Sequence, residues 1–100
     1  MLPYCYMELS ERYIQKLESE GFAAVYEWQD PAGTAYLEHA HRGKVSFFVT
    51  DGSIVVTING ETKEVKANER YNVPPNTNHS VVVGPEGWIG IIGEEIEVDS

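Results

Sequence analysis

The spacing of hydrophobic residues along this 100-residue chain changes near residue 21. Before that point, Tyr13, Ile14 and Leu17 recur at intervals that place them on one face of an α-helix. Ser10 is of a residue type that caps helix N-termini, and Gly21 is of the type that ends helices. The pattern therefore predicts one helix between Ser10 and Gly21.

After residue 21 the pattern becomes short runs rich in Val, Ile, Tyr, Phe and Thr, which is typical of antiparallel strands. Asp51-Gly52 and Asn59-Gly60 favour tight two-residue hairpin turns, and the stretches 30–33 and 84–87 supply two further turns. Strands are expected near residues 23–29, 34–41, 45–50, 53–58, 61–66, 69–73, 78–83 and 87–92. Turns at this interval predict an all-β sandwich or barrel.

Length limits the organisation to one small core. We expect residues 1–21 to form an N-terminal segment and helix that packs on a barrel formed by residues 22–100. No apolar run approaches the roughly 20 residues that span a bilayer, and the first seven residues lack the basic and apolar regions of a secretion signal. A cytoplasmic location is the default expectation. Cys5 is the only cysteine, so an internal disulfide is excluded, and we interpret this thiol as a bystander rather than a nucleophile.

Charge excludes several classes of partner. Seven Lys and Arg residues against sixteen Asp and Glu residues give a net charge of -9. Such a chain repels phosphate backbones and anionic lipid surfaces, so neither nucleic acid nor a membrane is expected as a partner.

The chain has three histidines, and two of them are separated by one residue. Residues i and i+2 of a strand share a face, so His39 and His41 can present their imidazoles to a common point. His79, from a later strand, would complete a set of three nitrogen ligands. Such a set suits zinc, iron, nickel, copper or manganese better than magnesium or calcium, which predicts a site for one divalent transition metal.

The alternation of strand residues predicts the neighbours of this site. If the histidines face inward, Leu37 points inward with them, whereas Tyr36 and Glu38 point away. In the strands that follow, the same alternation places four apolar residues around the cavity: Val45, Phe47, Val49 and Val81. Tyr71 is a weak candidate for a proton donor at the mouth of the cavity, and its simpler interpretation is an amphipathic wall residue.

The motifs around the histidines resemble those of the cupins, which are small double-stranded β-helix barrels of the jelly-roll type. Gly33, five residues, His39–His41, then Val45 and Gly52 are similar to the first cupin motif, and Pro74–His79 is similar to the second. The resemblance implies a small single-domain cupin of the cupin 2 type, all-β with one N-terminal helix.

Two positions depart from the cupin motifs. Asn76 stands where the family prefers Gly, a mild change because Asn also enters the left-handed backbone region. Val45 stands where the family has a metal-binding glutamate, so the resemblance implies three histidine ligands without a carboxylate. This ligand set is similar to that of the thiol dioxygenases and some diketone-cleaving cupins. Uncompensated metal charge and open coordination positions favour an anionic ligand.

Two interpretations of function therefore stay open. One is a metal-dependent enzyme of the dioxygenase type acting on a small anionic substrate. The other is a non-catalytic cupin that binds or senses a small ligand, with or without a metal. On the outer face, five residues are expected to form an apolar surface that either the helix or a second copy of the chain covers: Phe48, Val55, Val82, Ile89 and Ile91. Cupins commonly dimerise, so the resemblance favours a homodimer.

Overall fold

The computed structural model describes residues 8–95. Cys5, the rest of the first seven residues and the acidic residues 96–100 lie outside this range, so the expectations for them stay predictions. The described elements are α1 (Leu9–Ser19), β1 (Ala24–Asp30), β2 (Ala35–His39), β3 (Val45–Ile58), β4 (Glu61–Lys66), β5 (Arg70–Val73) and β6 (His79–Glu94). Across residues 8–95, no helix has the length and apolar character needed to cross a membrane.

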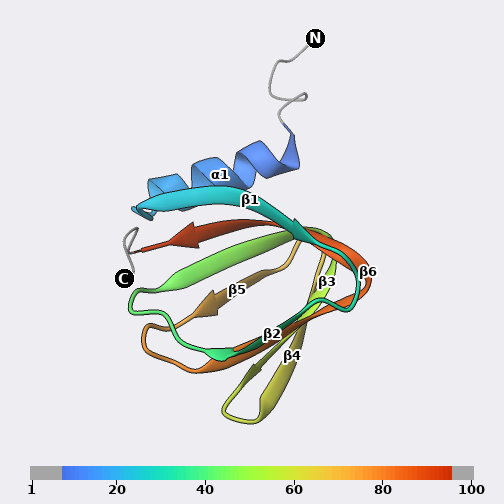
Figure 1. The fold of residues 1–100 in the computed structure, drawn as a ribbon. Helices are drawn as coiled ribbons and strands as arrows, with labels where there is room; N and C mark the ends of the chain where they lie inside the picture. The colour runs from blue at the N-terminus through green and yellow to red at the C-terminus, as the bar shows by residue number, and fades with distance from the viewer. Residues whose placement is uncertain (1–7, 96–100) are drawn as a thin grey trace.

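The strands form one antiparallel, strongly curved sheet in which β3 and β6 are the two long central members. β6 pairs with β1, β2 and β3, and β3 also pairs with β4 and β5. Figure 1 shows these strands curving around a common interior, with α1 lying outside against β1. The predicted all-β fold with one N-terminal helix is confirmed. The barrel core consists of buried side chains from β3, β4, β5 and β6: Val45, Phe47, Val49, Ile54, Val56, Val65, Val73, Val83 and Trp88.

Two of the expected turns are wrong, because the chain bends there without leaving the sheet. The stretches 45–50 and 53–58 are one strand, β3, and the stretches 78–83 and 87–92 are one strand, β6. At Asp51-Gly52 only the glycine has a positive φ, of 73°, whereas a hairpin turn of the expected type needs two. A Cβ atom on Gly52 would lie 1.9 Å from the carbonyl oxygen of Gly87, so β3 and β6 bend together in close backbone contact. Register shifts on β3 flank this bend.

The hairpin at Asn59-Gly60 is confirmed. Both residues have positive φ, 53° and 82°, and Ile58 pairs with Glu61 across the turn. This geometry matches the type I′ turn, which follows the natural twist of antiparallel strands. The turn therefore joins β3 to β4 as the sequence predicts.

The helix starts slightly earlier than expected. It begins at Leu9 with Glu8 as the N-cap, and the Glu11 carboxylate accepts a hydrogen bond of 3.2 Å from the Glu8 backbone N–H. Ser10 therefore lies within the first turn and is not the cap. The predicted end is confirmed, since α1 stops at Ser19 and Gly21 has a φ of 93°.

The helix packs on the outer face of the sheet. Leu17 is fully buried and clusters with Phe22 and Ile91. The Tyr13 ring stacks on the Phe48 ring, with centroids 4.0 Å apart and planes within 2°. The helix therefore covers Phe48 and Ile91 of the expected apolar surface. Val82, on the same expected surface, is 48% exposed. Cover by a second copy of the chain stays a prediction. The division of the chain at residues 21 and 22 likewise stays a prediction.

An ion-pair network holds the end of the helix to the sheet. Arg70 of β5 donates through both terminal nitrogens to the Glu20 carboxylate and through Nε to the Ser46 hydroxyl, and its guanidinium lies 5.0 Å from the centre of the Phe48 ring. Hydrogen bonding to Arg70 lowers the pKa of Glu20 from 4.5 to about 2. Glu20, Arg70 and Ser46 therefore provide hydrogen-bond partners for one another on the outer face of the sheet.

Candidate metal centre and adjoining cavity

The three histidines converge at one end of the barrel. His39 ends β2 and His79 begins β6, and the two residues are direct partners in the antiparallel pairing of these strands. His41 follows in the loop after β2. The backbone N–H of Asn76 donates a hydrogen bond of 2.6 Å to the His41 carbonyl, which joins that loop to the segment before His79. Asn76 has a φ of 56°, the left-handed conformation expected at this motif position.

The distances between the imidazoles suit a shared ion. The ring centroids of His39 and His79 are 4.3 Å apart, those of His39 and His41 are 4.9 Å apart, and those of His41 and His79 are 5.4 Å apart. One nitrogen from each ring lies within 4.8 Å of the others. Two nitrogens bound to one zinc ion in tetrahedral geometry are about 3.4 Å apart, so a pair at the 4.8 Å limit would have to close by roughly 1.4 Å. The cluster is therefore able to hold a metal.

Backbone carbonyls orient two of the imidazoles. The Nδ1 of His39 lies 2.7 Å from the Leu37 carbonyl oxygen, and the Nδ1 of His79 lies 3.1 Å from the Thr77 carbonyl oxygen. A carbonyl only accepts, so we assign the proton to Nδ1 and the lone pair of the neutral ring to Nε2. Burial lowers the pKa of His79, which is 5% exposed, and its proximity to His39 and His41 contributes to the shift. A lowered pKa favours the neutral ring, the form that binds metals.

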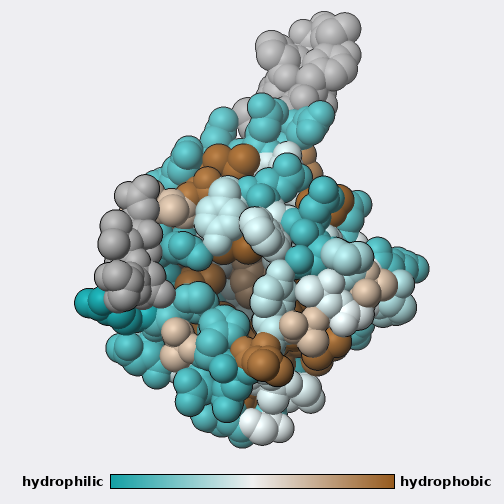
Figure 2. Space-filling model, viewed as in Figure 1, coloured by the Kyte–Doolittle hydropathy of each residue, from teal (hydrophilic) through white to brown (hydrophobic). Residues whose placement is uncertain are grey.

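A cavity of about 240 Å³ adjoins the histidines. Figure 2 shows the corresponding hollow in the face turned to the viewer, with hydrophobic residues visible in its depth. Sixteen residues line the cavity: Tyr26, Trp28, Asp30, Tyr36, His39, His41, Val45, Phe47, Ile54, Val56, Val73, His79, Val81, Trp88, Ile92 and Glu94. Of the four apolar residues expected here, Val45, Phe47 and Val81 are in the lining. The fourth, Val49, is fully buried in the core beneath it.

One expectation about the cavity wall is wrong. Leu37 was expected to face inward and Tyr36 outward, but Leu37 is 86% exposed and Tyr36 lines the cavity. The register of β2 against β6 shifts between Tyr36 and His39. An irregularity of one residue reverses the faces of all residues on one side of it. Strict alternation counted back from His39 therefore assigned Leu37 and Tyr36 to the wrong faces of β2.

Tyr71, the weak candidate for a proton donor, lies beside the cavity rather than in its lining. It pairs with Phe47 across β5 and β3, and the two ring centroids are 5.9 Å apart. Its side chain packs against the barrel core. This position fits the simpler interpretation of a wall residue.

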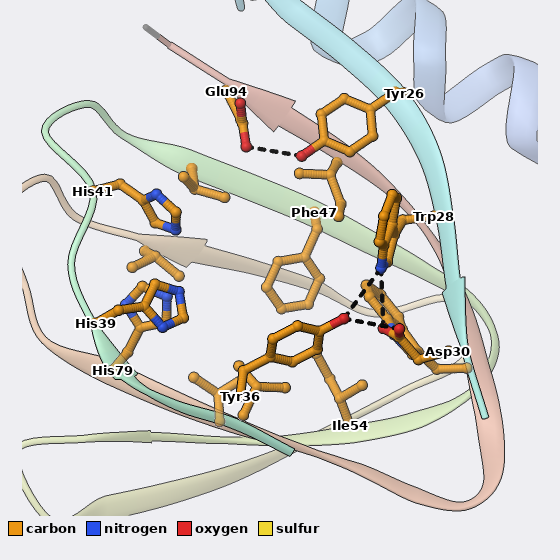
Figure 3. A pocket seen from close by; sticks show the side chains of 16 residues that line it. Tyr26, Trp28, Asp30, Tyr36, His39, His41, Phe47, Ile54, His79 and Glu94 are labelled. Carbon is orange, nitrogen blue, oxygen red and sulfur yellow. Dashed lines mark hydrogen bonds between the residues drawn. The ribbon is translucent and has the colours of Figure 1, made fainter. Parts of the chain in front are cut away.

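A hydrogen-bond network at the far end of the cavity was not expected from the sequence. The Asp30 carboxylate accepts hydrogen bonds from the Tyr36 hydroxyl at 2.8 Å, from Trp28 Nε1 at 3.1 Å and from Trp88 Nε1 at 3.0 Å. Figure 3 shows the Trp28–Asp30–Tyr36 contacts on the side of the cavity opposite the histidines. Burial raises the pKa of Tyr36, so its hydroxyl stays protonated and donates to Asp30.

A second carboxylate in the lining is also held by an aromatic residue. The Tyr26 hydroxyl donates a hydrogen bond of 2.8 Å to Glu94 Oε2, and burial followed by this contact raises the pKa of Tyr26. Tyr26, Trp28 and Asp30 alternate along β1 and so share its inner face. That alternation was the available signal in the sequence. The residues that contact this face of β1, Tyr36 on β2 and both Trp88 and Glu94 on β6, are brought to it only by the fold.

The family follows from the sequence match together with this geometry. The profile of the cupin domain matches residues 26–86, a stretch that includes all three histidines. The chain belongs to the cupin domain family. No match was found among the curated proteins.

Solved cupin structures resemble the chain in fold. An RmlC-like cupin from Shewanella frigidimarina is 26% identical, with a TM-score of 0.66, over 77% of this chain and 69% of that one. The Cnp3 cupin domain of Schizosaccharomyces pombe is 25% identical, with a TM-score of 0.66, over 71% of this chain and 50% of that one. The DMSP lyase DddQ from Ruegeria pomeroyi has a TM-score of 0.70 over 80% of this chain and 41% of that one, but at 16% identity this likeness shows the fold alone.

Proposed function

We propose that this cupin binds one divalent transition metal on His39, His41 and His79, and that the adjoining cavity holds a small organic ligand with an anionic group directed to the metal. The observation that carries the proposal is the convergence of all three histidines of the chain on one point at the end of a cavity that opens to solvent. Two of the rings are held with Nδ1 at a carbonyl, which leaves Nε2 to bind.

The position of Val45 supports an anionic ligand. Its side chain lines the cavity where the cupin motif has a carboxylate, so the three neutral imidazoles leave the charge of a divalent ion uncompensated. A carboxylate, thiolate or enolate would supply that charge. Phe47 and Val81 provide apolar surface for the rest of the ligand.

The chemistry we propose for the loaded site is that of a metal-dependent oxygenase. A redox-active ion such as iron supplies activation of dioxygen or of the bound ligand when it is present. The protein's own contribution would be orientation of the ligand rather than proton transfer, because both carboxylates of the lining, Asp30 and Glu94, already accept hydrogen bonds from aromatic side chains.

The same observation on the two carboxylates favours a second candidate, a non-catalytic cupin that binds or senses its ligand. A site without an available general base is suited to binding. Oxygen uptake by the iron-loaded protein, measured across a panel of small thiols, carboxylates and diketones, separates the candidates. Uptake that depends on both iron and His41 supports the oxygenase, and ligand binding without uptake supports the binding protein.

The test of metal binding is elemental analysis of protein purified without an affinity tag or added metal. We expect about one equivalent per chain in the wild type and none in His41→Ala. Glu38→Ala is the matched control, because Glu38 is an exposed carboxylate beside His39 and lies outside the cavity lining. One equivalent retained by His41→Ala would contradict the proposal. A homodimer and a cytoplasmic location also stay predictions, open to light scattering and to fractionation of cells.

A further inference from the structure

The cavity wall opposite the histidines is aromatic and carries a negative charge. It is formed by Trp28, Tyr36 and Trp88, with the Asp30 carboxylate between them, and the Phe47 ring packs against Trp88 with centroids 5.8 Å apart. Figure 3 shows Trp28 nearly edge-on, with one face of the ring turned toward the interior. We call this surface the aromatic–Asp30 wall.

The charges around the cavity all have one sign. In the described part of the chain, the lining contains two carboxylates, Asp30 and Glu94, and neither lysine nor arginine. Lys44, which follows the histidine loop, instead lies over the Phe22 ring at 5.4 Å from its centroid. A carboxylate among aromatic faces makes this end of the cavity attractive to cations.

We propose that the aromatic–Asp30 wall binds the cationic headgroup of a small ligand, and that this headgroup is a quaternary ammonium or a sulfonium. The proposal deepens the function proposed above, on which it rests only for the anionic half of the ligand. The ligand is then a zwitterion whose anionic group lies at the histidines and whose cation lies against Trp28 and Asp30.

The hydrogen bonds of Asp30 distinguish a quaternary ammonium or a sulfonium from a primary ammonium. A carboxylate has about four lone-pair positions, and Tyr36, Trp28 and Trp88 occupy three of them. The negative charge remains, but few acceptor positions are left for new N–H donors. A primary ammonium brings three donors that need partners when water is removed, whereas a quaternary ammonium or a sulfonium brings none. Aromatic faces attract such cations without hydrogen bonds.

The volume limits the ligand to a small molecule. A cavity of about 240 Å³ lies just below the roughly 300–1,000 Å³ that is usual for pockets holding drug-sized ligands. A short chain between the two charged groups fits this space, and a polymer does not. Trp28 is 48% exposed and Tyr36 is 37% exposed, so the wall is accessible from solvent.

The two tryptophans of the chain both line this cavity, so intrinsic fluorescence reports directly on its occupancy. The probes are choline, its uncharged isostere 3,3-dimethyl-1-butanol, and ethanolamine, titrated into metal-free protein at constant ionic strength. We expect choline to bind about tenfold more tightly than either of the others, in the range of a partly desolvated cation–π contact. Equal affinity for choline and its isostere would overturn the proposal.

Variants locate the effect. Asp30→Asn removes the charge, and Trp28→Leu removes an aromatic face while Trp88 remains as the reporter; each should reduce the preference for choline to about threefold or less. Trp28→Phe keeps a face and should retain most of the preference, as should Glu64→Gln, which removes an exposed carboxylate on β4. A preference that survives both Asp30→Asn and Trp28→Leu would overturn the proposal. Trp28 is half-exposed, so the Trp28 variants decide the question should Asp30→Asn fail to fold.

A final arm separates this proposal from the proposed metal function. Zinc-loaded protein is titrated with glycine betaine, which carries both a methylated ammonium and a carboxylate, and with choline, which lacks the carboxylate. Zinc should tighten betaine binding about tenfold and leave choline unchanged. If choline keeps its preference over the isostere while zinc has no effect on betaine, the cation site stands and the anionic metal site is rejected. If the isostere comparison fails, the cation site is rejected whatever zinc does.

Discussion

The two faces of β3 differ in what surrounds their polar groups. On the outer face, Ser46 is fully buried and joined by hydrogen bonds to Asn72 and Arg70, and Phe48 is covered by the helix. On the inner face, Val45 and Phe47 line a cavity that ends in three imidazoles. Every buried polar side-chain atom in residues 8–95 has a partner, but only the inner face keeps space beside its polar groups. We infer that the outer face of β3 serves mainly to stabilise the fold, and that the inner face serves to bind the proposed metal and ligand.

The largest expected effect lies on the outer face. Leu17→Ala removes a fully buried side chain between the helix and the sheet, and we expect a loss of about 2–5 kcal/mol in the free energy of unfolding. Metal stoichiometry should be unchanged in the folded variant. Chemical denaturation and elemental analysis measure the two quantities, with the exposed neighbour Glu18→Ala as the control. Loss of metal in folded Leu17→Ala would contradict the inference that the outer face affects stability but not metal binding.

The next effect lies on the inner face. Val45→Glu restores the carboxylate of the cupin motif, and we expect divalent metal binding to tighten by at least about tenfold, or about 1.4 kcal/mol. The metal-free variant should unfold more easily, because an unpaired carboxylate would then be buried. Val45→Gln adds an oxygen without the charge and separates the two contributions. Unchanged affinity in competition with a chelator would mean that position 45 does not face the ion.

The pH at which metal is released tests whether the histidines of the inner face are its ligands. Imidazole must be neutral to bind, and its reference pKa is about 6.5, so metal should be retained above that pH and lost as pH falls through about 6. Burial lowers the pKa of His79, which moves release toward lower pH. In the metal-free protein the unfolded chain takes up the proton more readily, so stability also falls as pH drops below 6.5. Dialysis at stepped pH followed by elemental analysis tests this; full retention at pH 4 would contradict it.

The smallest effect is electrostatic and lies on the outer face. The pKa of Glu20 is lowered to about 2 from 4.5, so its contribution to stability is present above pH 4.5 and is lost as pH falls toward 2. Glu20 and Arg70 are both partly exposed, so the contribution is modest. The melting temperature of Glu20→Gln should vary less with pH across this range than that of the wild type. The exposed Glu18→Gln is the control, and equal slopes in all three proteins would rule out the ion pair as a cause.

Local patterns predicted much of this molecule. The hairpin at Asn59-Gly60, the end of the helix at Gly21 and the inward alternation of Val45 and Phe47 follow from rules that act over a few residues. The convergence of the histidines was predicted, but part of its premise was wrong. Strand pairing places His39 opposite His79, whereas His41 lies in the loop after β2 and not in the strand that was expected to carry it with His39.

Contacts that depend on distant segments were missed. Asp51-Gly52 has the composition of a hairpin turn, but the backbone of Gly87 lies against it, and the chain continues as one strand. The irregularity in β2 reversed Tyr36 and Leu37, because alternation holds only while register holds. Asp30 was interpreted only as a turn residue. Its three donors come from β1, β2 and β6, and no short stretch of sequence brings them together.

The close contact of Gly52 with Gly87 limits how this protein can be engineered. Any side chain at position 52 would overlap the carbonyl group of Gly87. The curvature of β3 and β6 therefore cannot be adjusted by substitution at this position. A designer who wants room for a bulkier ligand must instead shorten side chains of the lining, such as Ile54 or Ile92, and leave the two glycines in place.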